Sequence, residues 1–383
     1  MCRNYPNSDP AYEGGAAEPT FEVYPPTPGF TPQLVNFVVN TSGLNSYPHM
    51  FLMPSGKMFA QANYSTSTSQ QIHGEWTTHH ASCSSVLWDV NSNHETPLPD
   101  MPNQVVRVYP ASGGVAMLPL TPANNWNPTI IFCGGALLTD EQWGNYSWPF
   151  VNTWEIPASK DCQRITPEPI DGSSPKYVQD DDLQFGRTMG QFICLPDGTL
   201  LFLNGAANGT AGYATRTLTT PLYSDMPLGM SLAADPVLTP AIYNPNAPAG
   251  SRWSSAGLGA SKIPRMYHSS ALLLPDTSVM IAGSNPNVDY NGTTIYSTEY
   301  RAEKFYPWYF AYSKPKPQGV PTKLAYGGPS FDITLSTDSY TGKPNDAAAN
   351  TTVVVIRGGF TTHASTLNNL NSLAFLTVLY WHR

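Results

Sequence analysis

Apolar residues recur along this chain as paired short runs, and a proline-containing turn separates the two runs of each pair. Met50–Asn63 reads MFLMPSGKMFAQAN and Phe192–Ala206 reads FICLPDGTLLFLNGA, while a third pair spans Ala271–Asn285 with Asp276-Thr277 at its turn. A Pro-x-Gly or Asp-Gly turn between β-prone segments supplies the positive φ that a tight hairpin needs. Each pair therefore predicts two antiparallel strands.

A longer variant of the same unit runs from Val115 through Pro119 to Phe132–Gly135, so the turn prolines fall at positions 54, 119, 196 and 275. One strand pair cannot bury both of its faces alone, and repeated pairs bury them by stacking on one another. The repetition predicts an all-β protein with a β-propeller over residues 1–298. An irregular β-sandwich is the alternative that the pattern leaves open.

The pattern changes after Glu299. Tyr300–Tyr309 is aromatic and basic, Lys314–Pro321 is rich in proline, and alternating strand-like residues follow as far as Val353–Ile356. We therefore expect a second β-domain over residues 299–383. An immunoglobulin-like sandwich takes about 100 residues, so this domain is expected to be truncated by a strand or two.

Composition narrows the class of protein. Charged residues make up only 12 % of the 383 residues and proline occurs 37 times, which is typical of many short strands joined by turns. The net charge is −8 and no run of Lys or Arg occurs, so neither nucleic acid nor a membrane surface is expected as a partner. The apolar runs are too short to span a bilayer, which favours a soluble protein.

The cysteines and the glycosylation signals indicate whether the protein is located inside or outside the cell. The five cysteines include no C-x-x-C pair and can form at most two disulfides. Six asparagines stand in N-x-S/T sequons, which suits an extracellular protein: Asn40, Asn63, Asn145, Asn208, Asn291 and Asn350. The first residues, Met1–Pro6, lack the apolar stretch of a secretory signal, so we expect sequence to be missing upstream.

Familiar catalytic signatures are absent: the chain has no P-loop, G-x-G-x-x-G, H-E-x-x-H, G-x-S-x-G or EF-hand loop. The acidic run Asp180–Asp182 is interpreted as a solvated turn in preference to a calcium site. Two histidines stand apart from the other six, because His268 directly precedes a predicted hairpin and His363 follows a strong strand. Side chains from separate elements converge at such strand ends.

Tyr267 lies next to His268. Neighbours on a regular strand point to opposite faces, so a metal bound by both requires a bend at this point. A phenolate with two imidazoles suits copper better than calcium or magnesium. A Tyr-His pair is also common in folded proteins, so spacing alone leaves both a copper site and an ordinary structural pair open.

Longer motifs resemble those of the glyoxal oxidase branch of the copper radical oxidases. Arg265–Ser269, followed by ALLLPDTSVMIAGSNPN, is similar to the copper-binding blade of glyoxal oxidase-like proteins, and Glu299–Pro307 resembles the start of their C-terminal early-set domain. Other matching segments follow in family order: Phe21–Pro26, Tyr47–Pro48, Arg107–Gly113, Met117–Leu120 and Phe132–Gly135. The resemblance implies a kelch-like, galactose oxidase-type propeller with an immunoglobulin-like domain whose loop reaches a central copper ion.

Carried over residue by residue, the resemblance implies that Tyr267 is the axial tyrosinate and His268 and His363 are the two imidazole ligands of one copper ion. In the family, the counterpart of Tyr267 takes the substrate's proton, while copper and a cysteine-linked tyrosyl radical accept one electron each. A small aldehyde, such as glyoxal or methylglyoxal, or a primary alcohol is oxidised, and O2 is reduced to H2O2 outside the cell.

The chain also departs from the family pattern. No match is found for the cysteine and tyrosine of the radical cofactor, and Arg107–Pro110 fits a later blade better, so Tyr109 is not assigned that role. The last residues, Ser365–Arg383, look unrelated to the family. We therefore expect an incomplete and inactive copy of an oxidase. The competing hypothesis is a non-catalytic propeller that binds glycans or proteins.

Overall fold

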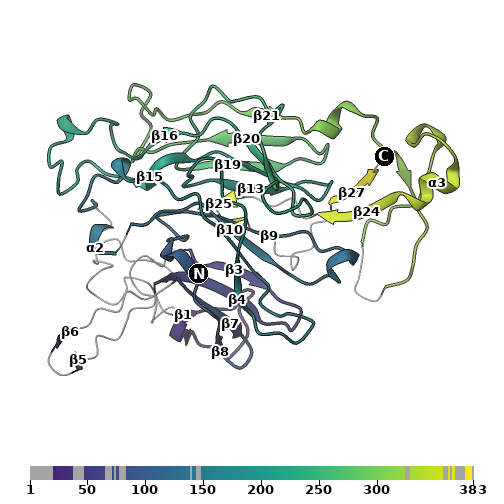
Figure 1. Cartoon of the computed structure of the whole chain (residues 1–383), viewed down its shortest axis with the longest axis horizontal. Helices are drawn as coiled ribbons and strands as arrows, with labels where there is room; N and C mark the ends of the chain where they lie inside the picture. The colour runs from purple at the N-terminus through teal and green to yellow at the C-terminus, as the bar shows by residue number, and fades with distance from the viewer. Residues whose placement is uncertain are drawn as a thin grey trace.

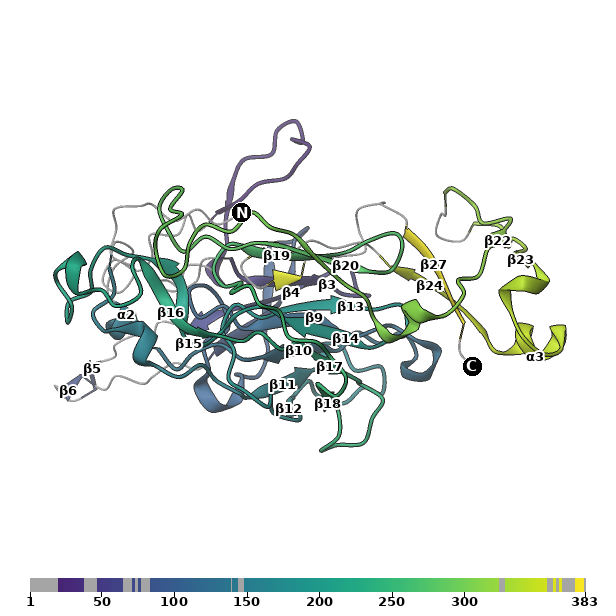
Figure 2. The ribbon, with the colours of Figure 1, turned by 90° about the horizontal axis from the view of Figure 1, so that it is seen from above.

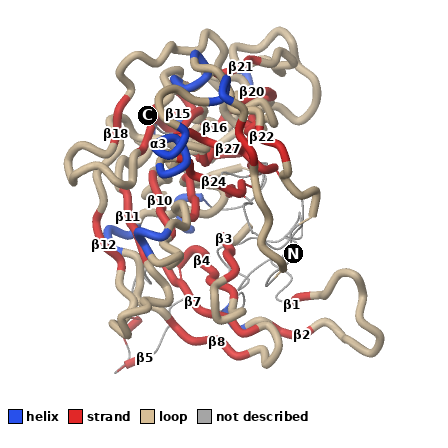
Figure 3. The backbone as a smooth tube through the Cα atoms, turned by 90° about the vertical axis from the view of Figure 1, so that its right-hand side faces the viewer, coloured by secondary structure: helices blue, strands red, loops and turns tan. Residues whose placement is uncertain are grey.

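The computed structural model describes residues 20–37, 47–64, 71–72, 75–76, 83–138, 140–143, 148–323, 328–356, 361–362, 365–366 and 376–381. Strands and loops dominate these residues, as Figure 3 shows, and the described α-helices are the short α2 (Asp140–Trp143) and α3 (Pro344–Ala349). The expected all-β class is therefore confirmed. None of the described helices has the length and apolar character needed to cross a membrane.

Four antiparallel sheets follow one another in chain order, and each begins with one of the hairpins expected from the sequence. Sheet A consists of β3 (His49–Leu52), β4 (Met58–Tyr64), β7 (Cys83–Asp89) and β8 (His94–Pro97). Sheet B consists of β9 (Gly114–Met117), β10 (Ile130–Cys133), β11 (Cys162–Ile165) and β12 (Tyr177–Gln179). Sheet C consists of β13 (Gln191–Cys194), β14 (Leu200–Leu203), β17 (Ala241–Tyr243) and β18 (Trp253–Ser254). Sheet D consists of β19 (Ser269–Leu273), β20 (Val279–Gly283) and β21 (Glu303–Phe305).

Shorter elements lie between and after these sheets. The two-stranded pairs are β1 (Thr20–Phe21) with β2 (Gln33–Leu34), β5 (Gln71–Ile72) with β6 (Glu75–Trp76), β15 (Ala206–Tyr213) with β16 (Ser231–Pro236), β22 (Pro317–Gln318) with β23 (Thr334–Leu335), and β24 (Thr351–Ile356) with β27 (Leu376–Trp381). The hairpin of β25 (Thr361–Thr362) and β26 (Ser365–Thr366) extends sheet B to six strands, because β26 pairs in parallel with β9. Single turns of 3-10 helix occupy Pro102–Gln104, Pro122–Asn124, Thr153–Glu155, Tyr223–Asp225, Trp308–Ala311 and Thr337–Ser339.

Alternation along the strands explains why the sheets stack face to face. On β10, Ile130 and Phe132 pack toward sheet A, while Ile131 and Cys133 pack toward sheet C. The A–B interface is formed by Phe51, Phe59, Leu87, Val115, Ile130, Phe132 and Ile165. The B–C interface is formed by Ala116, Ile131, Cys133, Cys162, Phe192, Leu200, Phe202 and Tyr243. Ile193, Leu201, Leu203, Ala271, Leu273 and Val279 join sheets C and D. Each buried large apolar side chain contributes about 1.5–3 kcal/mol, so stacking in chain order supplies the core.

The single described disulfide reinforces this core. Cys133 on β10 bonds to Cys162 on β11, at positions that pair directly across the two strands, with a Cα–Cα distance of 4.2 Å. The disulfide falls within the limit of two set by the cysteine count.

The acidic run does not form the solvated turn that the charge pattern suggested. Asp180 is buried, and its carboxylate pairs with Arg164 Nε at 2.8 Å and Arg252 Nη1 at 2.5 Å. The hydroxyl of Tyr243 donates to the same carboxylate at 2.5 Å. That expectation was wrong for Asp180 because the packing of sheets B and C brings two guanidinium groups to this position, and their charge compensates the buried carboxylate.

The first strands of sheets B, C and D lie side by side, since β13 contacts both β9 and β19. The hairpin β25–β26 lies among them, because β26 pairs in parallel with β9 and β25 contacts β19 (Figure 1). The elements β22, β23, β24, β27 and α3 form a separate group beside the sheets, as Figure 2 shows. The domain boundary at residue 299 and the closure of a propeller ring stay predictions.

Candidate functional site

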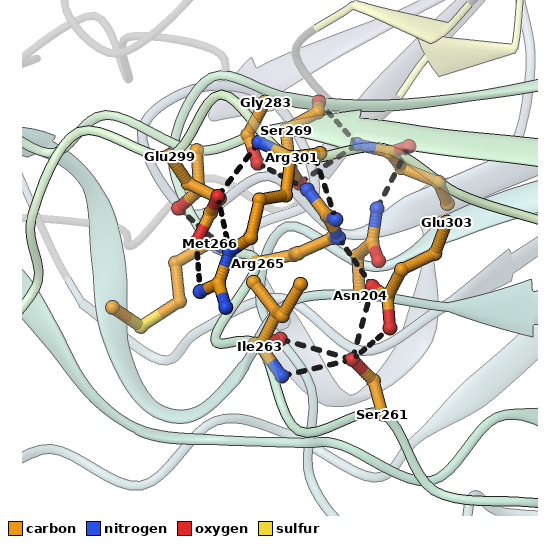
Figure 4. Close-up of polar contacts among 12 residues, drawn as sticks. Asn204, Ser261, Ile263, Arg265, Met266, Ser269, Gly283, Glu299, Arg301 and Glu303 are labelled. Atoms are coloured by element: carbon orange, nitrogen blue, oxygen red, sulfur yellow. Dashed lines mark hydrogen bonds and ion pairs between the residues drawn. The ribbon is translucent and has the colours of Figure 1, made fainter.

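A buried arginine precedes the first strand of sheets B, C and D. Arg107, Arg187 and Arg265 are each less than 5 % exposed. In sheet D, the guanidinium of Arg265 donates to Gly283 O at 2.8 Å and Arg301 O at 2.9 Å, and pairs with Glu303 at 2.9 Å (Figure 4). The guanidinium thereby ties the ends of β20 and β21 to the segment that carries Tyr267 and His268, two and three residues further along the chain.

The backbone bends at His268, as joint use of the two neighbouring side chains requires. His268 has φ 63°, and β19 begins directly after it. The bend places the rings of Tyr267 and His268 against each other, with centroids 3.8 Å apart and an interplanar angle of 26°. A glycine is required opposite the bend, since a Cβ on Gly283 would lie 2.6 Å from the His268 carbonyl oxygen. The two side chains that the sequence singled out therefore share one side of the chain.

The imidazole of His268 is held through one ring nitrogen. Its Nδ1 lies 3.0 Å from the carbonyl oxygen of Asn285, and a carbonyl only accepts, so Nδ1 carries a proton and Nε2 is the nitrogen left to bind a metal ion. Burial lowers the pKa of His268, although the bond to Asn285 acts in the opposite direction. A histidine held through one nitrogen by a carbonyl, with the other unprotonated, is the form that binds metal ions.

Tyr267 lies in an aromatic environment. Its ring centroid is 6.2 Å from that of Tyr109 and 6.2 Å from that of Tyr213, and buried Met189 and Met266 belong to the same cluster. Burial raises the pKa of Tyr267 to about 12, and a side-chain hydrogen bond between Tyr267 and Tyr109 partly offsets this rise. The phenol therefore holds its proton at neutral pH unless a cation stabilises the phenolate.

His363, the third residue of the expected site, lies outside the described residues, so its position relative to Tyr267 and His268 stays a prediction. The strands on either side of it, β25 and β26, are described and adjoin β19 and β9. In the described part of the chain, no group of three or more His, Cys, Asp or Glu side chains could hold a metal ion.

Sequence reasoning missed two features of this region. Tyr213, on β15, and Tyr109 contact Tyr267, although Tyr109 was considered only for the radical role. A signal for Tyr109 exists in the sequence, because Arg107-Val108-Tyr109 repeats the Arg-x-Tyr spacing of Arg265-Met266-Tyr267. His49, grouped with the unremarkable histidines, is only 1 % exposed.

The protein is thus an all-β protein of stacked antiparallel sheets. The pair Tyr267 and His268, which could bind a metal ion, lies at the start of the fourth sheet, sheet D. The sequence matches the family described as Glyoxal oxidase N-terminus over residues 4–309. The chain therefore belongs to the glyoxal oxidase family.

Relatives agree with this assignment. The chain is 32 % identical over 333 residues to "Aldehyde oxidase GLOX" of Vitis pseudoreticulata, covering 84 % of this chain and 53 % of the relative. It is 30 % identical over 340 residues to "Aldehyde oxidase GLOX1" of Arabidopsis thaliana, covering 85 % of this chain and 46 % of the relative. The chain thus spans about half the length of the curated relatives it matches.

Among solved structures, a fungal alcohol oxidase of the AA5 family in complex with copper superposes with a TM-score of 0.45 and 15 % identity. The superposition covers 88 % of this chain and 66 % of the other.

Proposed function

We propose that this chain carries the copper-binding part of an oxidase that converts small aldehydes or primary alcohols with O2 and releases H2O2. The observation that carries the proposal is the bend at His268, which places a phenol and an imidazole 3.8 Å apart, centroid to centroid. Membership of the glyoxal oxidase family, together with relatives named aldehyde oxidases, supplies the reaction class.

The donor set fits copper. Imidazole and phenolate ligands suit Cu(II), whereas calcium and magnesium prefer several carboxylate and carbonyl oxygens. Tyr267 and His268 would hold the ion together with His363, and His268 would bind through Nε2 because Nδ1 faces Asn285. Bound copper would supply a one-electron acceptor and a Lewis acid.

Tyr267 and His268 have distinct roles in the proposed proton transfer. The oxygen of Tyr267, a partly buried side chain, is the atom that would accept the substrate's proton. The hydrogen bond between His268 Nδ1 and Asn285 fixes the imidazole ring, so no reorientation is needed when a cation arrives.

The architecture proposed for this activity is an arc of propeller blades, sheets A to D, followed by an early-set domain over residues 299–383. The stacking of the sheets in chain order supports the arc, and the position of β25–β26 beside β9 and β19 supports a C-terminal loop that reaches the same region. The Cys133–Cys162 disulfide supports an extracellular location.

Copper titration of the full chain tests this proposal. We expect one Cu(II) per chain, with a visible phenolate-to-copper charge-transfer band that disappears in Tyr267→Phe and binding that weakens in His268→Gln. His94→Gln, which changes an exposed histidine on β8, serves as the control and should behave like the wild type. Equal copper binding and the same absorption band in all four proteins would contradict the assignment.

Oxygen consumption with glyoxal or methylglyoxal tests the expected incompleteness of this chain. Because no counterpart of the radical tyrosine and cysteine is recognised, we expect copper binding without turnover. Rapid O2 uptake by the copper-loaded chain would show that a radical site forms from other residues. A chain that unfolds cooperatively but binds no copper would favour the alternative of a non-catalytic binding module.

A further inference from the structure

The connection between β20 and β21 carries one of the six N-x-S/T sequons, Asn291-Gly292-Thr293. Asn291 N donates to Thr298 Oγ1 at 2.9 Å, and Thr298 N donates to Asn291 O at 2.8 Å, so the two limbs of this loop are tied together at the sequon. Thr298 Oγ1 also donates to Asn285 Oδ1 at 2.8 Å, which anchors the loop close to the end of β20. The sequon is therefore held in one defined conformation.

The side-chain amide of Asn291 presents its nitrogen to solvent. Asn291 Oδ1 accepts from Thr293 N at 3.0 Å and from Thr293 Oγ1 at 3.2 Å, which fixes the orientation of the amide. Among the residues that the structure describes, none accepts a hydrogen bond from Nδ2, and this nitrogen is not buried. Gly292 and Thr293 are both exposed. The atom that carries the sugar in N-glycosylated proteins is therefore accessible here.

The other two sequons whose side chains are described hold their amides in contacts. Asn208 Nδ2 donates to Asp235 Oδ2 at 2.5 Å, and Asn208 lies within β15, which pairs with β16. Asn350 Nδ2 donates to Asp346 O at 2.8 Å where α3 ends. A glycan on either asparagine would compete with its contact. Of these three positions, Asn291 accommodates a bulky glycan without the loss of a hydrogen bond.

An exposed pair of aromatic rings lies beside the Asn291 sequon. The ring of Tyr290 stacks on that of Tyr300, with centroids 6.0 Å apart and an interplanar angle of 27°, and the two residues are 69 % and 77 % exposed. The Tyr290 ring also lies over the middle of the sequon, since a Cβ on Gly292 would be 2.5 Å from the Tyr290 hydroxyl oxygen. Adjoining exposed apolar surfaces mark sites of contact, and the C–H groups of a sugar pack on an aromatic face.

We propose that Asn291 is N-glycosylated and that the first sugar packs on Tyr290 and Tyr300. Nδ2 exchanges one hydrogen for a bond to C1 of an oligosaccharide that a lipid diphosphate donor supplies. The C1–O bond of the donor breaks, the diphosphate leaves with the electron pair, and the displaced proton passes to solvent. The transfer takes place during secretion, so this inference rests on the proposed extracellular location and is independent of copper binding.

Secretion of the full chain from a eukaryotic host, directed by an added leader, tests the site. Enzymatic removal of N-glycans in water labelled with heavy oxygen converts each glycosylated asparagine into a labelled aspartate, which peptide mass spectrometry locates. We expect label at position 291 in the wild type and in Thr293→Ser, which keeps the sequon, and loss of this label in Thr293→Ala, which removes it. An unlabelled Asn291 in the wild type would overturn the assignment.

Thermal unfolding tests the packing of the sugar on the aromatic pair. Removal of the glycan should lower the Tm of the wild type and of Tyr300→Phe, which keeps the ring, by about 2 °C. The Tm of Tyr300→Ala should not change on removal. Equal changes in all three proteins would refute the packing and leave the modification in place. Label at other sequons without label at Asn291 would show that the chain was secreted and that this site alone fails. The copper titration is unaffected by either result, so failure of this inference is distinguishable from failure of the copper site.

Discussion

His49 offers a direct test of how the sheets pack. This histidine begins β3, is 1 % exposed, and its Nε2–H donates to the carbonyl oxygen of Arg107 at 3.2 Å. Burial is the main cause that lowers the pKa of His49 to about 4 from 6.5. Protonation would place a positive charge in the core, next to the buried guanidinium of Arg107.

The sign of the effect follows from linkage. Because the pKa is lower in the folded state, the unfolded chain binds the proton first, so stability is fully present above pH 6.5 and falls as the pH drops toward 4. The shift corresponds to a loss of about 2 kcal/mol by pH 5 and about 3 kcal/mol by pH 4. Urea unfolding followed by tryptophan fluorescence between pH 7.5 and 5 measures this loss.

A matched pair of variants isolates the contribution of His49. His49→Gln keeps a donor for the Arg107 carbonyl but cannot be protonated, so its stability should change with pH about 2 kcal/mol less than that of the wild type over this range. His94→Gln replaces an exposed histidine on β8 and should retain the wild-type pH dependence. If His49→Gln and wild type lose stability in parallel, the burial argument is refuted.

Two further changes probe the core. Asp180→Asn leaves the guanidinium of Arg252 without its buried carboxylate, so we expect the free energy of unfolding to fall by about 3 kcal/mol. Urea unfolding measures this change. A loss below about 1 kcal/mol would argue against the buried ion pair. The double change of Cys133 and Cys162 to serine opens a loop with a sequence separation of 29 and should cost about 3 kcal/mol. If the oxidised and the reduced wild-type proteins have the same free energy of unfolding, that estimate is contradicted.

The hairpins could be predicted because their cause is local. Phe192–Ala206 carries two apolar runs around a Pro-Asp-Gly turn, and the structure places β13 (Gln191–Cys194) and β14 (Leu200–Leu203) on these two runs. The need for a bend between Tyr267 and His268 also followed from strand geometry, and the positive φ of His268 supplies it. Spacing alone left open whether Tyr267 and His268 form a copper site or an ordinary structural pair. The prediction that Tyr267, His268 and His363 are copper ligands came from the resemblance to the family motifs.

The residues that the sequence did not reveal owe their roles to long-range packing. Asp180 reads as one member of an acidic run, yet sheet stacking encloses it between Arg164 and Arg252. His49 reads as an ordinary polar residue until sheets A and B cover it. Local periodicity contains no information on which distant strand will lie opposite, so burial of these groups could not be predicted.

The amino-acid sequence by itself determined the strand pairs and the Tyr267-His268 pair, because turns and strand geometry act between near neighbours. Only the tertiary structure decided that Tyr109, more than a hundred residues earlier, lies 6.2 Å from Tyr267, ring centroid to ring centroid. That contact exists because β15 is tied to Pro110 and the segment before β19 is tied to Gly205. These ties form only when sheets B, C and D stack together and bury their shared apolar faces.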